Sequence, residues 1–479
     1  MHLNKLHITN FRCFREYEIE FAPRVTVLFG KNGAGKSTLI HAIHKALSFA
    51  FYSDTKNTDR INLRSGFPEL KVESYIKTDG IRDDKTGMMF PYIDIEAEGN
   101  FQDVTLLWNL YASTSTFNLQ PSKYIEAYKS LINRIVETNK MPFMVYYSDS
   151  FPHISKPQKT SGKQDNLKNL GYLDWNKESA CSEIWLSRLK RTWTQWDRAD
   201  RSVKDAENAL NNCEILLQQG IVKQQAYEED VKLHNEKLKK SLNERSKYED
   251  ELSAIKTCLI NFSKGDNFYE ITDVFLSVYE ESDLCLETKQ GDNPSFRLLP
   301  AGYKRLYFMV LDIAYRSYIL NGTTDAEGIV IIDEIDLHLH PGLEQVVLGR
   351  FMNTFPNLQF IVSTHSPLVL TGLETKGKDN TIIQMTSELG TEKLREYKAI
   401  AYPNIYGLDY NLMLEENMGV QKREPLIQKL FDKAWQYVSE KEINKAKEVV
   451  DRLEELTPSD QSELIRLRSI INRLELLGR

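Results

Sequence analysis

The sequence predicts an α/β fold with a mixed, largely parallel sheet, which a helical hairpin interrupts and a helical region follows. Continuous apolar runs such as Val25–Phe29 and Ile329–Ile332 are typical of parallel strands that are buried on both faces. Helical patterns alternate with these runs, and the order strand–helix–strand implies parallel pairing. Between residues 189 and 262, apolar residues recur at spacings of three and four, which is typical of a coiled coil.

The expected elements follow one another along the chain. Strands are expected at 3–8, 17–21, 25–29, 92–96, 104–108 and 143–147, in stretches of 268–299, and at 329–332 and 360–362. Helices are expected from Gly35, at 122–139, 303–320 and 343–355, and from 425 to the end. Residues 148–172 are polar and contain Pro152, Pro157 and Gly162, which predicts a loop.

The coiled-coil stripe has two parts. One apolar series runs from Leu189 to Leu217, and a weaker one runs from Tyr227 to Phe262. Gly220 lies between them, so we expect an antiparallel hairpin that turns near Gly220; one long interrupted helix is the alternative. We expect the chain to divide into three parts. An α/β domain has two lobes, 1–175 and 266–424. A coiled-coil insertion, 176–265, separates the lobes, and a helical assembly region, 425–479, follows them.

Bulk composition indicates a globular protein of the reducing cytoplasm. Of the 479 residues, 41% are hydrophobic and 27% are charged, and no apolar run reaches the ~18 residues of a membrane span. The start of the chain has a strand pattern and does not resemble a signal peptide. Five scattered cysteines argue against a disulfide framework or a zinc site. The net charge of −7 confines any nucleic-acid contact to local basic patches.

A glycine-rich loop follows the strand at Val25–Phe29. Its sequence, Gly30-Lys-Asn-Gly-Ala-Gly-Lys-Ser37, matches the P-loop pattern in the expected strand–loop–helix context. Backbone N–H groups of such a loop face phosphates, Lys36 reaches the β- and γ-phosphates, and the Ser37 hydroxyl ligates Mg²⁺. A chance glycine turn is the alternative. The sequence therefore predicts an ATP site with these contacts: Gly33, Ala34, Gly35, Lys36, Ser37 and Thr38.

An acidic pair follows the buried strand Ile329–Ile332. Asp333 is expected to hold Mg²⁺ through water, and Glu334 to polarise the water that attacks the γ-phosphate. The alternative is a strand that ends in acidic residues at a turn. His365 follows another buried strand, Phe360–Val362, where its ring can donate a hydrogen bond to the γ-phosphate.

These motifs together resemble the ABC-type ATPases of the SMC, RecF and OLD group. The phrase Ile8-Thr-Asn-Phe-Arg-Cys-Phe14 is similar to the opening strand of that group. The resemblance covers roughly residues 1–50 and 290–370. It implies a head-to-head dimer, with Arg12 near the nucleotide, Asn32 near the γ-phosphate and Asp336 in the loop that crosses the dimer.

One motif departs from the family pattern. The family's signature loop carries Ser-Gly and acts on the partner's γ-phosphate, whereas this chain has Pro300-Ala301-Gly302. The N–H of Gly302 can still point at a phosphate, but the serine hydroxyl is missing. Losing one such donor can cost ~10²–10³ in rate, if an oxyanion-hole donor is a fair guide. We therefore expect ATP binding with slow hydrolysis.

No nuclease chemistry is expected in this chain. OLD-type nucleases carry a Toprim domain with an Asp-x-Asp pair, and no such pair follows His365. The cysteine and histidine spacing also gives no HNH-like cluster. The head, the short coiled coil, the Pro-Ala-Gly signature and the helical tail resemble the ATPase subunit of Septu-type anti-phage systems. That resemblance implies a separate HNH-type nuclease partner, in some systems together with a retron.

Three functions remain open at this point. The first is a regulatory ATPase that controls or delivers a nuclease, the second a RecF-like repair clamp, and the third an ATP-sensing scaffold without turnover. Contacts with DNA or retron nucleic acid would need local basic residues, although each candidate is more often simply a solvated charge. The candidates are Lys156, Lys159, Lys163 and Lys168 in the polar loop, and Lys237, Lys239 and Lys240 on the coiled coil.

The helical tail has a wide apolar surface on its last helix. That helix carries Leu464, Ile465, Leu467, Ile470, Ile471, Leu474, Leu476 and Leu477, which is more than one stripe. We expect the tail to build contacts with other subunits or with the nuclease. Packing against the sheet is the alternative.

Overall fold

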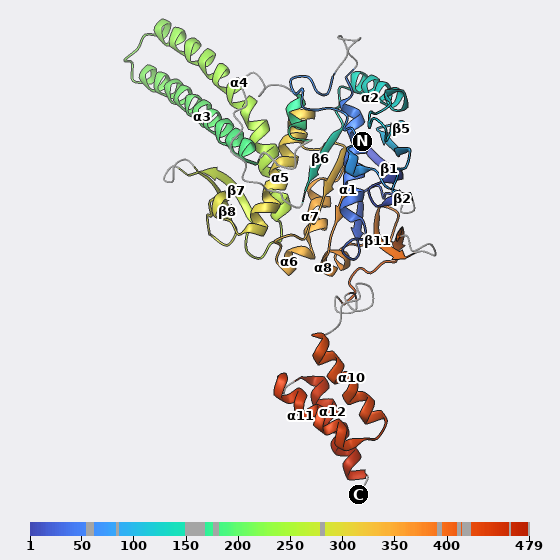
Figure 1. Cartoon of the computed structure of the whole chain (residues 1–479). Coiled ribbons are helices and arrows are strands. Elements are labelled where there is room, and N and C mark those ends of the chain that lie inside the picture. The colour runs from blue at the N-terminus through green and yellow to red at the C-terminus, as the bar shows by residue number, and fades with distance from the viewer. Residues whose placement is uncertain are drawn as a thin grey trace. The chain divides into compact units, whose positions relative to one another are not determined.

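The computed structural model describes residues 1–53, 62–82, 86–148, 168–175, 182–277, 283–389, 395–409, 413, 423–458 and 461–477 (Figure 1). Contacts divide the chain into two units, Met1–Tyr406, here called the head, and Gly407–Arg479. The boundaries expected at residues 175, 265 and 424 stay predictions. None of the helices in the described part is both long enough and apolar enough to cross a membrane.

A six-stranded sheet forms the centre of the head. Its strand order is β12-β11-β3-β10-β9-β6, and all neighbours are parallel except β11 and β12, which are antiparallel. Every residue of β3 and β9 is buried, as their continuous apolar sequences predict. The strands are β3 (Val25–Phe29), β6 (Phe143–Tyr147), β9 (Gly328–Ile332), β10 (Leu358–Ser363), β11 (Asn380–Leu389) and β12 (Arg395–Tyr402).

A second, antiparallel sheet has the order β2-β1-β4-β5. Its strands alternate buried and exposed residues, as expected for a sheet with one face on the core. They are β1 (His2–Phe11), β2 (Phe14–Glu20), β4 (Tyr92–Phe101) and β5 (Val104–Ser113). The helices of the head outside the hairpin are α1 (Lys36–Leu47), α2 (Ile125–Thr138), α5 (Ala301–Asn321), α6 (Pro341–Glu344), α7 (Val347–Thr354) and α8 (Pro367–Thr371).

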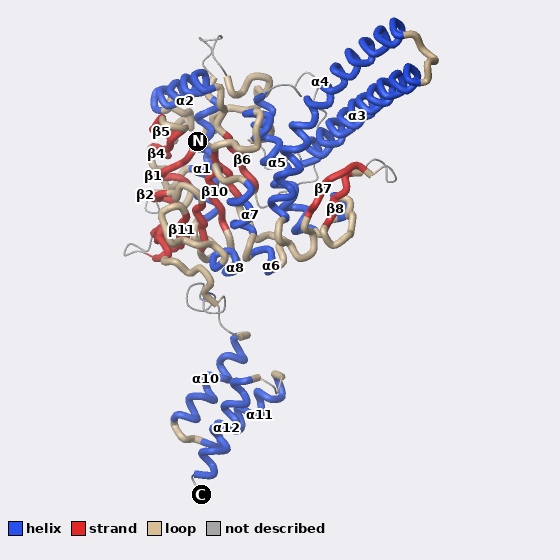
Figure 2. Tube along the Cα trace, turned by 180° about the vertical axis from the view of Figure 1, so that it is seen from behind, coloured by secondary structure: helices blue, strands red, loops and turns tan. Residues whose placement is uncertain are grey.

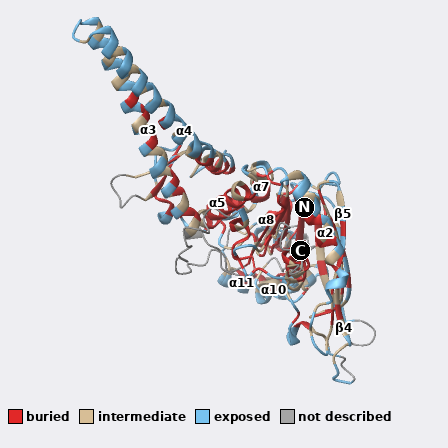
Figure 3. Ribbon diagram, turned by 90° about the horizontal axis from the view of Figure 1, so that it is seen from above, coloured by how far each residue is buried: buried red, intermediate tan, exposed pale blue. Residues whose placement is uncertain are grey.

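Two long helices, α3 (Ser182–Gln218) and α4 (Gln224–Ser263), lie side by side as an antiparallel hairpin (Figure 2). The chain turns at Gly220, whose φ of +70° favours glycine. The alternative of one long interrupted helix is therefore wrong. Burial is concentrated where the hairpin meets the rest of the head and falls away toward its tip, where Ile221 and Leu233 are exposed (Figure 3).

A buried carboxylate ties the hairpin to the sheet. Asp312 on α5 accepts hydrogen bonds from the Trp185 indole of α3, from the Tyr147 hydroxyl at 2.7 Å and from Arg316 Nε at 2.6 Å. Arg316 also donates to the carbonyl of Gly171 at 2.9 Å. A buried charge is tolerable only when it is paired and hydrogen-bonded in this way.

The structure departs from the sequence-based expectations in three places. The helix expected at 343–355 is two helices, α6 and α7, and the break lies at Gln345, where the backbone of Gly372 packs on its carbonyl. Residues 168–172, expected as loop, form a short 3-10 helix; 149–167 lie outside the described residues. The hairpin of β11 and β12 was not expected.

The second unit is a three-helix bundle of α10 (Pro425–Ser439), α11 (Ile443–Leu456) and α12 (Ser462–Leu477). It has its own apolar core, formed by Leu430, Phe431, Ala434, Ala446, Val450, Leu453, Leu464, Leu467 and Ile471. Much of the apolar surface of the last helix is thus used inside the bundle. Ile465 and Leu476 remain exposed.

We expect Leu467→Ala to loosen the bundle, whereas Leu476→Ala leaves it unchanged. Both leucines lie on α12, but Leu467 is 0% exposed and Leu476 is 76% exposed. Truncation of a buried leucine costs about 2–5 kcal/mol because it leaves a cavity, and a surface change costs about 0.5 kcal/mol or less. Amide hydrogen exchange of the three helices measures both effects. Equal protection in the two variants would contradict the assigned core.

Candidate functional site

The glycine loop joins β3 to α1 at the carboxyl end of the central sheet. Gly30, Gly33 and Gly35 have φ values of +153°, +81° and +93°. These values curl the backbone as a phosphate-binding loop requires. A Cβ at Gly30 would lie 2.2 Å from the carbonyl oxygen of Met385 on β11, so no other residue fits there. The structure therefore has the loop geometry that the sequence predicts.

Lys36 is the first residue of α1, and its side chain turns back into this loop. Its Nζ donates to the carbonyl oxygens of Gly30 at 2.8 Å and Lys31 at 3.3 Å. Burial lowers the pKa of Lys36, and the nearby carboxylates of Asp333 and Glu334 partly oppose that shift. The two motifs, nearly 300 residues apart in sequence, thus share one electrostatic site. Asn32 and Ser37 are exposed at the same loop, and Thr38 is half-buried.

Ser363 at the end of β10 fixes the acidic pair that follows β9. Its hydroxyl donates to the carboxylate of Asp333 and accepts the N–H of Glu334 at 2.8 Å. Glu334 has a φ of +51°, which a non-glycine residue adopts only when its surroundings hold it. The N–H of Asp333 also donates to Tyr147 at 2.8 Å. The sequence analysis assigned no role to Ser363, although it lies two residues before His365.

The loop that contains His365 holds Asp336. Thr364 Oγ1 donates to Asp336 Oδ1 at 2.6 Å, and the N–H of His365 donates to the same oxygen at 3.3 Å. Asp336 is therefore bound within its own chain in this structure. The ring of His365 is half-buried directly after β10, where the sequence placed it.

The signature segment packs on the acidic turn of the same chain. Arg305, almost fully buried on α5, donates to the carbonyl oxygens of Glu334 at 2.8 Å and Leu337 at 3.0 Å. A Cβ at Gly302 would lie 2.6 Å from the carbonyl oxygen of His338. Close packing thus requires glycine at residue 302 whatever Gly302 does across a dimer. The sequence did not indicate a role for Arg305, because its hydrogen-bond partners are backbone carbonyl groups, which no sequence motif identifies.

Arg12 is held beside α1 by a residue that the sequence analysis did not identify. The Arg12 backbone N–H and Nε both bind Asp79, the latter at 2.9 Å to Oδ1. The fully buried Asp79 also lies 3.5 Å from Lys45 Nζ on α1. Arg12 remains about one-third exposed, so its cation can serve a ligand at the loop.

The predicted basic patches lie apart from this site. Lys237, Lys239 and Lys240 are exposed on α4, and Lys168 donates to Asn139 Oδ1 at 3.2 Å. The other candidates, Lys156, Lys159 and Lys163, lie outside the described residues. Nothing in the described geometry joins these lysines to the P-loop.

The donor set fits MgATP. The Ser37 hydroxyl and the Asp333 carboxylate are oxygen ligands of the kind that Mg²⁺ prefers. The positive φ values of the loop shape it for a phosphate, and Lys36 supplies the cation. In the described ranges, no group of three or more His, Cys, Asp or Glu side chains is arranged to hold a metal ion.

Comparison with known proteins identifies the family. A model of the AAA ATPase domain matches residues 1–370. The chain belongs to the AAA ATPase domain family. This match confirms the predicted resemblance and the α/β ATPase fold. The matched region ends before β11, so the AAA ATPase domain of this chain continues its sheet with two strands beyond the match.

Individual relatives and solved structures are similar to this chain at low sequence identity. "Retron Vc95 probable ATPase" of Vibrio cholerae is 27% identical over 393 residues, which are 77% of this chain and 71% of that protein. "Septu protein PtuA" of Bacillus mycoides is 32% identical over 160 residues, 33% of this chain and 21% of that protein. An Smc head domain with an extended coiled coil from Pyrococcus furiosus has a TM-score of 0.43 at 15% identity, covering 87% and 99% of the two chains.

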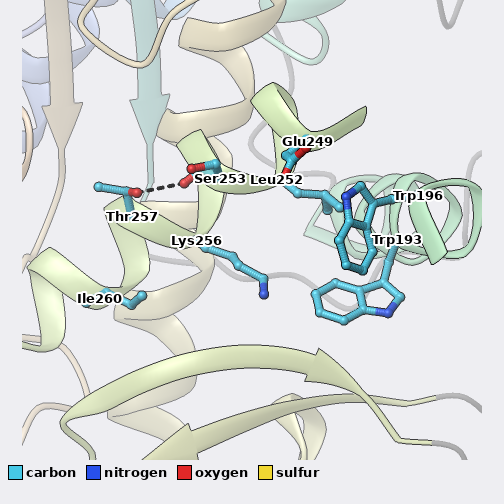
Figure 4. A pocket seen from close by; sticks show the side chains of 8 residues that line it. All are labelled: Trp193, Trp196, Glu249, Leu252, Ser253, Lys256, Thr257 and Ile260. Atoms are coloured by element: carbon cyan, nitrogen blue, oxygen red, sulfur yellow. Dashed lines mark hydrogen bonds between the residues drawn. The ribbon is translucent and has the colours of Figure 1, made fainter. Parts of the chain in front are cut away.

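A separate pocket of about 270 Å³ lies at the base of the helical hairpin (Figure 4). Trp193 and Trp196 of α3 face Lys256 of α4 across it, and Lys256 Nζ lies 4.3 Å from the centre of the Trp193 ring. Lys256 also pairs with Asp273 Oδ1 on β7 (Ile271–Leu276), at 2.7 Å. No residue of the ATPase motifs lines this pocket.

We expect Gly302→Ala to destabilise the AAA ATPase domain by about 1–3 kcal/mol, the usual cost of overpacking. The new methyl group would overlap the His338 carbonyl. Gly349→Ala is the matched control, because Gly349 also lies in a helix but has no atom within 4 Å of the added methyl. Replacing a helical glycine should stabilise by about 0.5–1 kcal/mol. Urea denaturation followed by tryptophan fluorescence measures both; shifts of the same sign would contradict the close approach at Gly302.

Proposed function

We propose that the chain is the ATP-binding, slowly hydrolysing regulatory subunit of an anti-phage defence complex, and that it controls or delivers a separate HNH-type nuclease. The observation that carries the ATP site is Lys36 in the glycine loop beside Asp333 and Glu334. The similarity to a retron ATPase and to a Septu protein supports the defence context. The nuclease partner follows from the Septu resemblance alone.

The residues of the site have distinct roles in this proposal. Loop N–H groups and Lys36 bind the β- and γ-phosphates, with Lys36 exchanging its carbonyl contacts for phosphate oxygens. Ser37 and Asp333 would hold Mg²⁺, which neutralises phosphate charge when bound. Glu334 orients and polarises the attacking water, and the His365 ring donates to the γ-phosphate.

The remaining predicted contacts act at the edges of the nucleotide or across a dimer. Arg12 and Asn32 approach the nucleotide from the same chain. Gly302 and Asp336 act on the partner's nucleotide in a head-to-head dimer. Because Pro300 and Ala301 replace the signature serine, the transition state loses one hydroxyl donor, and hydrolysis is slow. This departure is also what favours the second candidate, a scaffold that senses ATP without turnover.

The three-helix bundle is the proposed assembly region. Because α12 contributes Leu464, Leu467 and Ile471 to the bundle core, removal of residues 459–479 alone would expose that core. Deletion of 423–479 is therefore the informative truncation. It should keep ATP binding while reducing the assembled mass and the amount of bound nuclease.

We expect Lys36→Ala to abolish ATP binding, because no other side chain in the loop supplies the buried cation. Equilibrium binding of a fluorescent ATP analogue with Mg²⁺ measures the loss. Lys129→Ala on α2 removes a half-exposed lysine far from the P-loop in sequence and serves as the control. If Lys36→Ala binds ATP as the unmodified protein does, the site assignment is wrong.

Glu334→Gln is expected to retain nucleotide and to stabilise the head-to-head dimer, because the water-activating carboxylate is removed while Asp333 stays. Phosphate release and light-scattering mass with ATP are the two measurements. Unchanged turnover together with unchanged dimerisation would count against Glu334 as the base. Turnover near zero in the unmodified protein would favour the scaffold.

The nuclease partner is tested by purification from the native host, followed by mass spectrometry. A stoichiometric HNH protein is the expected result. Its absence would favour the RecF-like clamp, for which no nuclease is required. If such a clamp binds DNA through phosphates, its affinity must fall as salt rises.

A further inference from the structure

The β11–β12 hairpin extends beyond the carboxyl edge of the central sheet. Gln384 on β11 pairs with Phe29, the last residue of β3, and β11 then continues through Met385–Leu389. At ~3.3 Å per residue, these five residues carry the hairpin roughly 17 Å past the start of the glycine loop. In open α/β sheets, ligands bind outside this edge. The hairpin therefore lies on the side of the sheet where a nucleotide would bind.

Two contacts fix the hairpin, one against the glycine loop and one against β2. The carbonyl oxygen of Met385 occupies the space that a Cβ of Gly30 would take, at 2.2 Å. On β12, the ring of Tyr397 meets Phe14 edge to face, with ring centroids 5.4 Å apart. The hairpin and the loop are thus in direct contact, although more than 350 residues separate them in sequence.

Arg395 opens β12 and lies beside the loop. Its guanidinium nitrogen Nη1 is 3.9 Å from the position that a Cβ of Gly33 would occupy. Residues alternate faces along a strand, so Arg395 shares its face with Tyr397, which interacts with Arg395 and with Cys13. Lys398 is on the opposite face, 3.7 Å from Glu396. The same strand therefore offers one cation toward the loop and one away from it.

We propose that Arg395 is a nucleotide-binding residue, which reaches from β12 over the glycine loop to the phosphates of ATP. This inference rests on the proposed ATP site. A guanidinium presents planar, paired donors to phosphate oxygens and keeps its charge at any physiological pH. Arg395 is exposed, so it can move from Tyr397 to a phosphate without disturbing a core. It adds a contact from outside the family match, which ends at residue 370.

The test compares Arg395→Gln with Lys398→Gln, which remove one positive charge each from opposite faces of β12. A fluorescent ATP analogue with Mg²⁺ is the probe, and the full chain is used. Arg395→Gln should weaken binding about tenfold, the loss expected for one charged hydrogen bond. Lys398→Gln should stay within about twofold. Melting temperatures without nucleotide should match, because both side chains are exposed.

Salt dependence gives a readout that a merely structural role would not move. The difference in affinity between the unmodified protein and Arg395→Gln should shrink as salt rises, because ions screen an exposed cation–phosphate contact. Arg395→Lys, which keeps the charge, should recover part of the affinity. Binding by Arg395→Gln within about twofold of the unmodified protein, or an equal loss in Lys398→Gln, would overturn the inference. If Arg395→Gln binds ATP normally while Lys36→Ala loses binding in the same series, the ATP site stands and only the role of Arg395 fails.

Discussion

The rest of the head depends on the hydrogen bonds that the buried carboxylate of Asp312 accepts. It binds Trp185 of the helical hairpin, Arg316 of its own helix and the hydroxyl of Tyr147. Tyr147 in turn accepts the N–H of Asp333 through its backbone carbonyl. Burial raises the pKa of the Tyr147 hydroxyl, with the Asp312 charge adding to the shift, so this hydroxyl stays protonated and remains a donor. A short chain of contacts thus connects the hairpin to the acidic pair.

Backbone contacts then hold the acidic turn in one conformation. The Ser363 hydroxyl on β10 accepts the N–H of Glu334, and the Arg305 guanidinium on α5 donates to carbonyl oxygens of the turn. The positive φ of Glu334 can persist because both sides over-determine the turn. Helix α5 therefore carries the signature segment, Arg305, which holds the turn, and Asp312, whose carboxylate binds Trp185 of the hairpin. The carboxylate of Glu334, which we propose as the general base, is thus positioned before any ligand arrives.

The sequence predicted the strands whose pattern is local, and it did so because burial on both faces leaves little choice of residue. The bounds of β3 and β6 match the expected runs. The β11–β12 hairpin was missed because β12, at the sheet edge, is largely exposed and lacks an apolar run. Contacts such as that of Arg12 with Asp79 join residues that are far apart in the sequence, so no residue spacing predicts them. The apolar stripe of the last helix was visible in the sequence, but such a stripe does not show which surface it packs against.

The length of the helical hairpin would amplify any rotation at its base. Its 37-residue first helix is roughly 55 Å long at 1.5 Å per residue. Its largest buried side chains, Trp185, Leu186 and Leu189, lie at the end nearest the rest of the head, and smaller buried residues continue only to Ala206. A rotation of about 5° at that end displaces the tip by roughly 5 Å, the rise of about one helical turn. A small rotation around Trp185 at the base would therefore become a much larger displacement at the tip.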